Sequence, residues 1–378
     1  MITIRTLHHI RLFYGAYFAA MGLILPYFPI YLSQQGLTAA QIGFLTGLLA
    51  LAKMIAPPWI GHLLDAKSPR YVHRFTIATA LCAALGAMMI GYSSALAWLT
   101  PTILLFGICW AVMLPITDAL SITLSESRQG DYGRLRLWGS IGFIITSLAG
   151  GLWLLQAMQW LPLILALLML IVALATRGFP RIHHRRQEQI TPFPRSFYLL
   201  LLIGTLMQLS HGAYYGFFSL YLQAAGYNGL QIAIYWVLGV AAEVILMGYW
   251  NSRLQQYPLP LLLTSCLLLA ALRWFGTGFT THAILLVMLQ LLHAASYAAF
   301  HLTTLAWVKR MAPIDRHSEA QGLFSAAGFG LGSTIGIMLC GVVTDMAGFP
   351  AAFYLCGAIA LLAIPVVKAL DRQMQHNP

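Results

Sequence analysis

The chain has 378 residues with a formal net charge of +11; 60% of them are apolar and only 8% are Asp, Glu, Lys or Arg. Soluble domains carry roughly 25% charged residues, so these few charges could not cover a soluble globule of this size. The composition therefore excludes a cytosolic enzyme, a disordered chain and a nucleic-acid-binding protein. The five cysteines lie singly in apolar runs without ligand spacing, so neither a disulfide framework nor a zinc site is predicted.

Long apolar runs dominate the chain. A hydrocarbon core needs about 20 apolar helical residues to cross, and in lipid each backbone group must be satisfied within its own helix. The sequence therefore predicts an all-α, polytopic membrane protein with twelve transmembrane helices. The first run is too long for a cleaved signal peptide, and another span follows it at once. The predicted spans are 10–33, 40–63, 72–93, 96–124, 134–157, 159–176, 197–222, 231–250, 258–279, 282–311, 320–344 and 349–368.

The basic residues mark one side of the membrane. All Lys and Arg except Lys53 and Arg273 lie at the termini or beside the loops that follow even-numbered spans. The positive-inside rule then predicts that both termini are cytoplasmic, in the inner membrane of a bacterium. The charge of +11 is thus a topology signal, and no nucleic-acid partner is expected.

The longest internal loop, 177–196, is basic and contains three prolines. It divides the chain into an N-terminal six-helix half, 1–176, and a C-terminal six-helix half, 197–378. Two six-helix halves joined by a cytoplasmic loop are typical of transporters that alternate access around a site near the bilayer midplane.

Ionisable side chains within spans are costly, and each is a candidate functional residue. Asp118 and Arg136 lie on consecutive antiparallel spans at similar distances from the turn that joins them, which predicts an ion pair. This pair either lines the transport cavity or forms a structural bridge at its rim. Lys53 lies about ten residues into its span, too deep to reach the interface easily. It is expected to pair with a substrate carboxylate, with Asp118 or with Glu243.

The C-terminal half has its own ionisable set. Desolvation favours the protonated form of Glu243, which suits a carboxyl that gains and loses a proton; the alternative is a permanent pair with Arg273 or His293. Arg273 either belongs to the site or extends to the periplasmic interface. His211 opens a stretch that includes Tyr215, and such rings either stack on a substrate or fill space.

The short loop after the second span contains Gly61, Asp65 and Arg70. An acid at a helix end beside basic residues makes charge-assisted bonds, so this is either a gating motif or ordinary loop electrostatics. The sequence contains no Walker, G-x-S-x-G or H-E-x-x-H motif. We therefore expect no enzymatic activity, metal or cofactor, and the proton gradient as the energy source.

Several segments resemble the major facilitator superfamily. GHLLDAKSPR follows the second span as a degenerate copy of the family's loop motif, and YFPIYL, PITDAL and DYGRLRLWGSIGF are similar to the branch containing lactose permease and nucleoside–proton symporters. AYYGF, GVAAEV, LRWFG and LHAASYAAFHL look like the phenylpropionate-transporter-like members. The resemblance covers nearly the whole chain and implies the major facilitator fold.

The resemblance also implies roles for particular residues. In the lactose-permease pattern an acid in span 4 and an arginine in span 5 bind the sugar, and they match Asp118 and Arg136. An arginine in span 9 and a histidine in span 10 match Arg273 and His293. The acid expected one turn after that histidine is replaced by Ser296, which leaves Glu243 or Asp118 to carry the proton, with His293 as a further proton-coupling candidate.

The sequence thus predicts a proton symporter that imports a small aromatic carboxylate, with small-molecule substrate, protons and lipid as its partners and no obligate protein partner. A symporter of an oligosaccharide or nucleoside is the alternative, and a membrane enzyme or non-transporting sensor is a third reading. The substrate is expected to bridge two groups of side chains from the two halves. The expected substrate-binding residues are Lys53, Asp118, Arg136, His211, Tyr215, Arg273 and His293.

Overall fold

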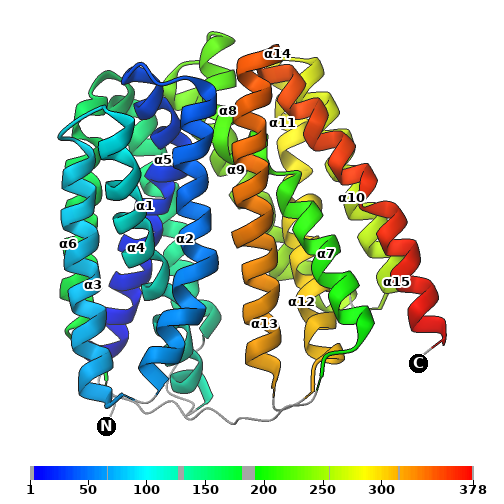
Figure 1. Cartoon of the computed structure of the whole chain (residues 1–378), viewed down its shortest axis with the longest axis horizontal. Coiled ribbons are helices and arrows are strands. Elements are labelled where there is room, and N and C mark those ends of the chain that lie inside the picture. The colour runs from blue at the N-terminus through cyan, green and yellow to red at the C-terminus, as the bar shows by residue number, and fades with distance from the viewer. Residues whose placement is uncertain are drawn as a thin grey trace. The chain divides into compact units, whose positions relative to one another are not determined.

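The computed structural model describes residues 4–65, 67–126, 132–180, 192–254, 256–313 and 316–376, and every regular element in these ranges is helical (Figure 1). Short 3₁₀ turns, η1 and η2, and two π-helical stretches, η3 and η5, interrupt the α-helices. The elements are α1 Ile4–Gln34, α2 Ala39–Asp65, α3 Pro69–Ile90, α4 Leu96–Glu126, α5 Tyr132–Trp153, η1 Leu154–Gln156, η2 Met158–Trp160, α6 Leu161–Thr176, α7 Arg195–Leu209, α8 Gly212–Ala224, α9 Gly229–Leu254, α10 Leu259–Phe279, α11 Ala283–Leu291, η3 Ala294–Ala299, α12 Phe300–Met311, α13 His317–Ser325, η5 Ala326–Gly332, α14 Ser333–Leu362 and α15 Ile364–His376.

The helices match the predicted spans closely. Eleven segments among the described residues are long and apolar enough to cross a membrane. The last of them, Glu319–Gln375, is far longer than one crossing needs, and Gly348 interrupts it with a φ of 81° that only glycine adopts easily. The predicted spans 320–344 and 349–368 lie on either side of this glycine. The all-α, polytopic membrane fold is confirmed, and twelve spans are a close fit to it.

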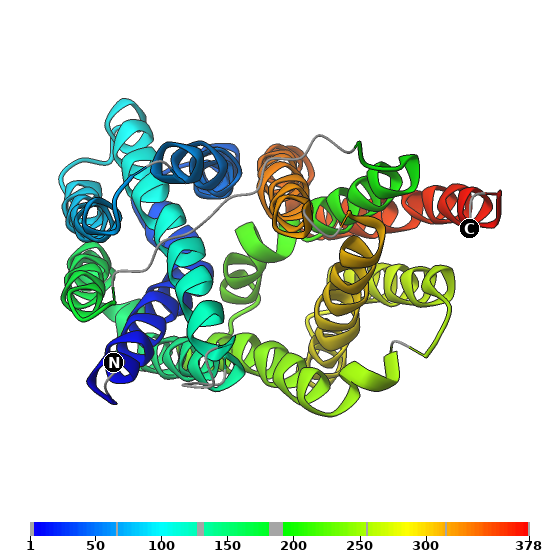
Figure 2. The same cartoon turned by 90° about the horizontal axis from the view of Figure 1, so that it is seen from below.

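The chain divides into two compact units. Unit 1 comprises 1–37, 51–186 and 228–233. Within it α1 packs along α5 and α6, and α3 packs on α4 and on α6, as the view along α3 and α6 in Figure 2 shows. The α1–α5 approach depends on glycine, because a Cβ on Gly142 would collide with the backbone of Gly15.

Unit 2 comprises 38–50, 187–227 and 234–378. Within it α14 packs against α7, α8 and α10. The carboxylate of Asp345 caps the start of α2, accepting hydrogen bonds of 2.8 Å from the backbone N–H groups of both Ala39 and Ala40. Part of the predicted linker, 181–191, lies outside the described residues, so the predicted boundary between the halves stays a prediction.

Two breaks in helical geometry occur at histidines. The α-helix is interrupted between α7 and α8 at Ser210 and His211, and His211 directly precedes α8. His293 directly precedes the π-helical turn η3. Such turns rotate the following side chains relative to a regular helix and are frequent at functional sites.

Candidate functional site

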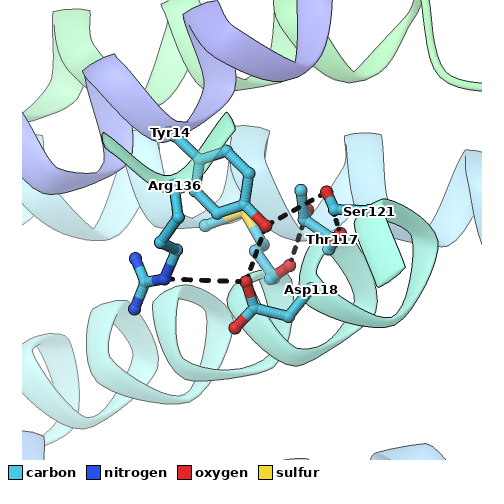
Figure 3. A network of polar contacts seen from close by, with 6 residues as sticks. Tyr14, Thr117, Asp118, Ser121 and Arg136 are labelled. Atoms are coloured by element: carbon cyan, nitrogen blue, oxygen red, sulfur yellow. Dashed lines mark hydrogen bonds and ion pairs between the residues drawn. The ribbon is translucent and has the colours of Figure 1, made fainter. Parts of the chain in front are cut away.

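The predicted pair of Asp118 and Arg136 is present in unit 1. Figure 3 shows the two side chains facing each other, with 3.9 Å between Arg136 Nε and Asp118 Oδ1. Tyr14, from α1, donates from its hydroxyl to the same carboxylate oxygen at 2.6 Å and to Ser121 Oγ at 3.1 Å. Asp118 is therefore held from two neighbouring helices.

The ion pair of Arg136 and Asp118 is partly exposed. The side chains of Arg136 and Asp118 are 35% and 25% exposed. The Arg136 guanidinium also lies over the Phe18 ring, 4.2 Å from its centroid. An ion pair this long and this accessible contributes little to stability, which leaves both groups able to exchange partners.

Lys53 has an aromatic partner and not an acidic one. Its Nζ lies 4.8 Å from the centroid of the Trp110 ring, a cation–π contact. Among the described residues of unit 1, no carboxylate lies within ion-pair distance of this ammonium. The predicted pairing of Lys53 with Asp118 is therefore wrong, because Asp118 is held by Arg136 and Tyr14. Glu243 belongs to the other unit, so the predicted pairing of Lys53 with Glu243 stays a prediction.

The ring that Lys53 contacts belongs to a group of stacked rings. Trp110 stacks on Tyr17 and Phe106 with centroid separations of 5.2 and 5.8 Å, and Tyr17 stacks in turn on Phe13. Trp110 is 1% exposed, and its Nε1–H has no hydrogen-bond partner in the described structure. Unit 1 thus places a cation against one ring of a buried aromatic stack.

Arg273 is the centre of a buried cluster in unit 2. Its side chain is fully buried, so the alternative in which it extends to the periplasmic interface is wrong. The guanidinium packs against the neighbouring rings of Tyr214 and Trp274, at 4.4 and 4.3 Å from their centroids. It donates to Gln290 Oε1 at 2.9 Å and to Ser296 Oγ at 3.2 Å. These contacts replace the hydration that burial removes from the charge.

His293 joins this arginine to Glu243. Arg273 NH1 lies 2.6 Å from His293 Nδ1, and His293 Nε2 lies 2.6 Å from Glu243 Oε1. The Glu243 side chain is 15% exposed and that of His293 is 5% exposed, so the acid is the more accessible end of the chain. Arg273, His293 and Glu243, predicted separately, form one hydrogen-bonded row.

His211 and Tyr215 adjoin this row. The His211 ring stacks on Tyr215 at 5.7 Å, meets Trp274 edge-on at 4.9 Å and lies 6.1 Å from the His293 ring. His211 itself is fully buried, with Nδ1 2.8 Å from the Met207 carbonyl oxygen.

The structure describes only part of the predicted gating motif. Gly61 lies in α2 and Arg70 is exposed at the start of α3, whereas the side chain of Asp65 lies outside the described residues.

Sequence reasoning missed three partners. Tyr14 positions Asp118, Trp110 faces Lys53, and Gln290 holds Arg273. A polar residue one turn before His293 was a usable signal for Gln290. Tyr14 and Trp110 gave no signal, because aromatic residues in apolar spans read as packing.

Comparisons with known proteins agree on one class of protein. The model of the MFS_1 like family matches residues 7–355. A probable 3-phenylpropionic acid transporter of Escherichia coli strain K12 is 31% identical over 94% of each chain. The maltose permease of Geobacillus stearothermophilus is 27% identical, covering 96% of this chain and 94% of that one. The crystal structure of the nucleoside transporter NupG superposes with a TM-score of 0.83 at 17% identity, covering 97% of this chain and 98% of that chain.

Proposed function

Because the chain belongs to the MFS_1 like family, whose members are multi-pass membrane transporters and not enzymes, we propose that it imports a small aromatic carboxylate together with a proton. The transport is across the bacterial inner membrane, by alternating access, with both termini in the cytoplasm. The class of substrate is that of 3-phenylpropionic acid, after which the 31% identical relative is named.

The observation that carries the proposal is the position of Lys53. A cation within a span is costly unless it is paired or hydrated, and among the described residues of unit 1 the partner of Lys53 is the face of Trp110. A carboxylate supplies the missing counter-ion. An aromatic acid is the carboxylate that the name of the 31% identical relative indicates.

The charges of Glu243 and Arg273 in unit 2 support the proposed coupling to protons. With Glu243 ionised, its negative charge offsets that of Arg273 through the neutral His293 between them. Protonation of Glu243 leaves the charge of Arg273 uncompensated inside the protein. Binding of a proton at Glu243 and of a carboxylate at Lys53 together leaves the net charge of the protein unchanged, so the two are expected to favour each other's binding. Asp118, whose charge stays offset by Arg136, is the less suitable coupling acid.

A sugar or a nucleoside is the second candidate. The maltose permease and a putative nucleoside transporter of Escherichia coli strain K12, 24% identical, match nearly the same length of chain. The accessible Asp118–Arg136 pair offers acceptors and donors to hydroxyl groups. Neither substrate has a negative charge, however, and each leaves Lys53 without a counter-ion.

Uptake into proteoliposomes with an imposed pH gradient tests the proposal. The panel contains 3-phenylpropionate, maltose and a nucleoside, each measured with and without the gradient. We expect gradient-driven accumulation of 3-phenylpropionate alone. Accumulation of maltose or the nucleoside instead selects the second candidate, and no gradient-driven uptake of any compound refutes proton symport.

Replacement of Glu243 by Gln separates coupling from binding. Glutamine keeps a hydrogen-bonding group at the position but cannot exchange a proton. We expect the variant to lose gradient-driven accumulation and to retain counterflow of substrate. Unchanged accumulation contradicts the assignment of the proton to Glu243, and Asp118→Asn in the same assay then tests the other acid.

A further inference from the structure

The hydrogen-bonded row of Arg273, His293 and Glu243 has a fixed direction. A guanidinium carries only donors, so NH1 of Arg273 donates and Nδ1 of His293, 2.6 Å away, accepts. An imidazole without a hydrogen on either nitrogen is an anion that proteins do not hold at neutral pH. The hydrogen of His293 is therefore on Nε2, and it is donated to Glu243 Oε1 at 2.6 Å.

A second proton cannot join His293 in this arrangement. It would sit on Nδ1, pointing at the N–H of Arg273 across 2.6 Å. Arg273 is restrained, because Gln290 and Ser296 accept from its two terminal nitrogens and its guanidinium packs against the rings of Tyr214 and Trp274. His293 is thus kept neutral while Arg273 is in place.

Glu243 is left as the proton acceptor of the row. Its Oε1 already accepts from His293, so an incoming proton binds Oε2, on the end of the row that is the more exposed. We propose that Arg273 is a positioning residue that fixes the tautomer of His293 and thereby assigns the transported proton to Glu243 and not to His293. This inference rests on the proposed proton coupling and deepens it.

The surrounding titratable groups do not replace Arg273 in this role. The other groups that face His293 are Tyr214 on α8, Tyr297 on η3 and His211 before α8, with ring centroids 5.1, 5.3 and 6.1 Å away. His211 has the opposite tautomer, because its Nδ1 lies 2.8 Å from the Met207 carbonyl oxygen, which can only accept, and its buried Nε2 has no partner among the described residues to receive a second hydrogen. One cluster therefore contains two neutral histidines of opposite tautomer, and His211 serves as an internal reference.

Transport by three variants tests the assignment of the proton. Gln in place of His293 offers a carbonyl acceptor to Arg273 and an amide donor to Glu243, but it cannot be protonated. We expect His293→Gln to keep gradient-driven accumulation, lowered by about threefold because its geometry fits less well. His293→Phe, which removes both bonds, is expected to lose accumulation, and Glu243→Gln to lose it while retaining counterflow. If His293→Gln instead behaves like Glu243→Gln, the histidine carries the proton and the inference is wrong.

The tautomers themselves are measured without substrate, by ¹⁵N-histidine solid-state NMR of the protein in bilayers. His293→Gln and His211→Asn identify the two signals. We expect a bare Nδ1 and a protonated Nε2 for His293 between about pH 5 and 8, the reverse for His211, and a His293 that titrates once Arg273 is replaced by Met. A doubly protonated His293 in the parent protein overturns the inference. If the parent shows no gradient-driven uptake, the proposed function fails and this measurement still decides the role of Arg273.

Discussion

At the scale of single residues, the cations in the spans differ in the groups that they contact. Arg136 contacts a carboxylate, Arg273 is linked to one through His293, and Lys53, in the described part of unit 1, contacts an aromatic face. Since an uncompensated charge is the least stable of the three, Lys53 is the residue whose replacement should depend most on the charge of the ligand.

Replacing Lys53 with Met removes the charge and keeps a flexible apolar chain against Trp110. We expect affinity for 3-phenylpropionate to fall about 10- to 100-fold, the range for a lost charge-assisted hydrogen bond, while binding of the neutral 3-phenylpropionamide changes little. Competition against radiolabelled substrate measures both. Lys53→Arg, which keeps the charge, is the matched control. An equal loss for the acid and the amide would show that Lys53 acts through packing only.

Replacing Tyr14 with Phe removes the donor that holds Asp118. The bond at 2.6 Å is charge-assisted but partly exposed, so we expect the initial rate of uptake to fall about 3- to 10-fold. Tyr27→Phe on the same helix is the control, because the Tyr27 hydroxyl donates to the backbone carbonyl of Ser147 and touches no ionised group. Equal losses in the two variants would mean that Tyr14 only stabilises the fold.

At the scale of elements, breaks in helix geometry and helix caps position the functional side chains. The interruption between α7 and α8 places His211, and η3 begins directly after His293. Gly348, with its positive φ, marks the point where one long apolar run divides into two helical segments. The cap on α2 by Asp345 is the element-scale contact most open to a direct test.

Replacing Asp345 with Ala leaves the first backbone N–H groups of α2 without their acceptor. Loss of such a cap costs on the order of 1 kcal/mol, so we expect a lower thermal transition in detergent, followed by tryptophan fluorescence. Asp345→Asn keeps one acceptor oxygen and should lie between Ala and the parent. Asp371→Ala, an acid on α15, is the control. An unchanged transition for Asp345→Ala would show that solvent caps the helix equally well.

At the scale of the whole molecule, the proposed coupling makes a prediction about charge movement. One proton and one carboxylate anion carry no net charge, so uptake should follow the pH gradient and not the membrane potential. A potassium diffusion potential imposed with valinomycin at equal pH is expected to drive no accumulation, whereas a pH gradient at zero potential drives it. Accumulation driven by the potential alone would mean that more than one proton accompanies each substrate molecule.

The sequence by itself determined the class of fold and the candidate residues. A bilayer requires long apolar helices and makes each charge within them costly, and both features are visible in the linear sequence. The spans, and Lys53, Asp118, Arg136, Glu243 and Arg273 as the residues to examine, therefore followed without any knowledge of contacts. The Asp118–Arg136 pair was predictable too, since the two residues lie on consecutive predicted spans only 18 positions apart in the sequence.

Only the tertiary structure decided which side chains meet. Tyr14 and Asp118 are 104 residues apart, and Lys53 faces Trp110 from a different helix. The direction of the row from Arg273 through His293 to Glu243 depends on which ring nitrogen faces which neighbour, at distances near 2.6 Å. Such contacts depend on how each helix is rotated about its own axis, and the sequence pattern does not determine that rotation. For this reason the charges were predictable while their partners were not.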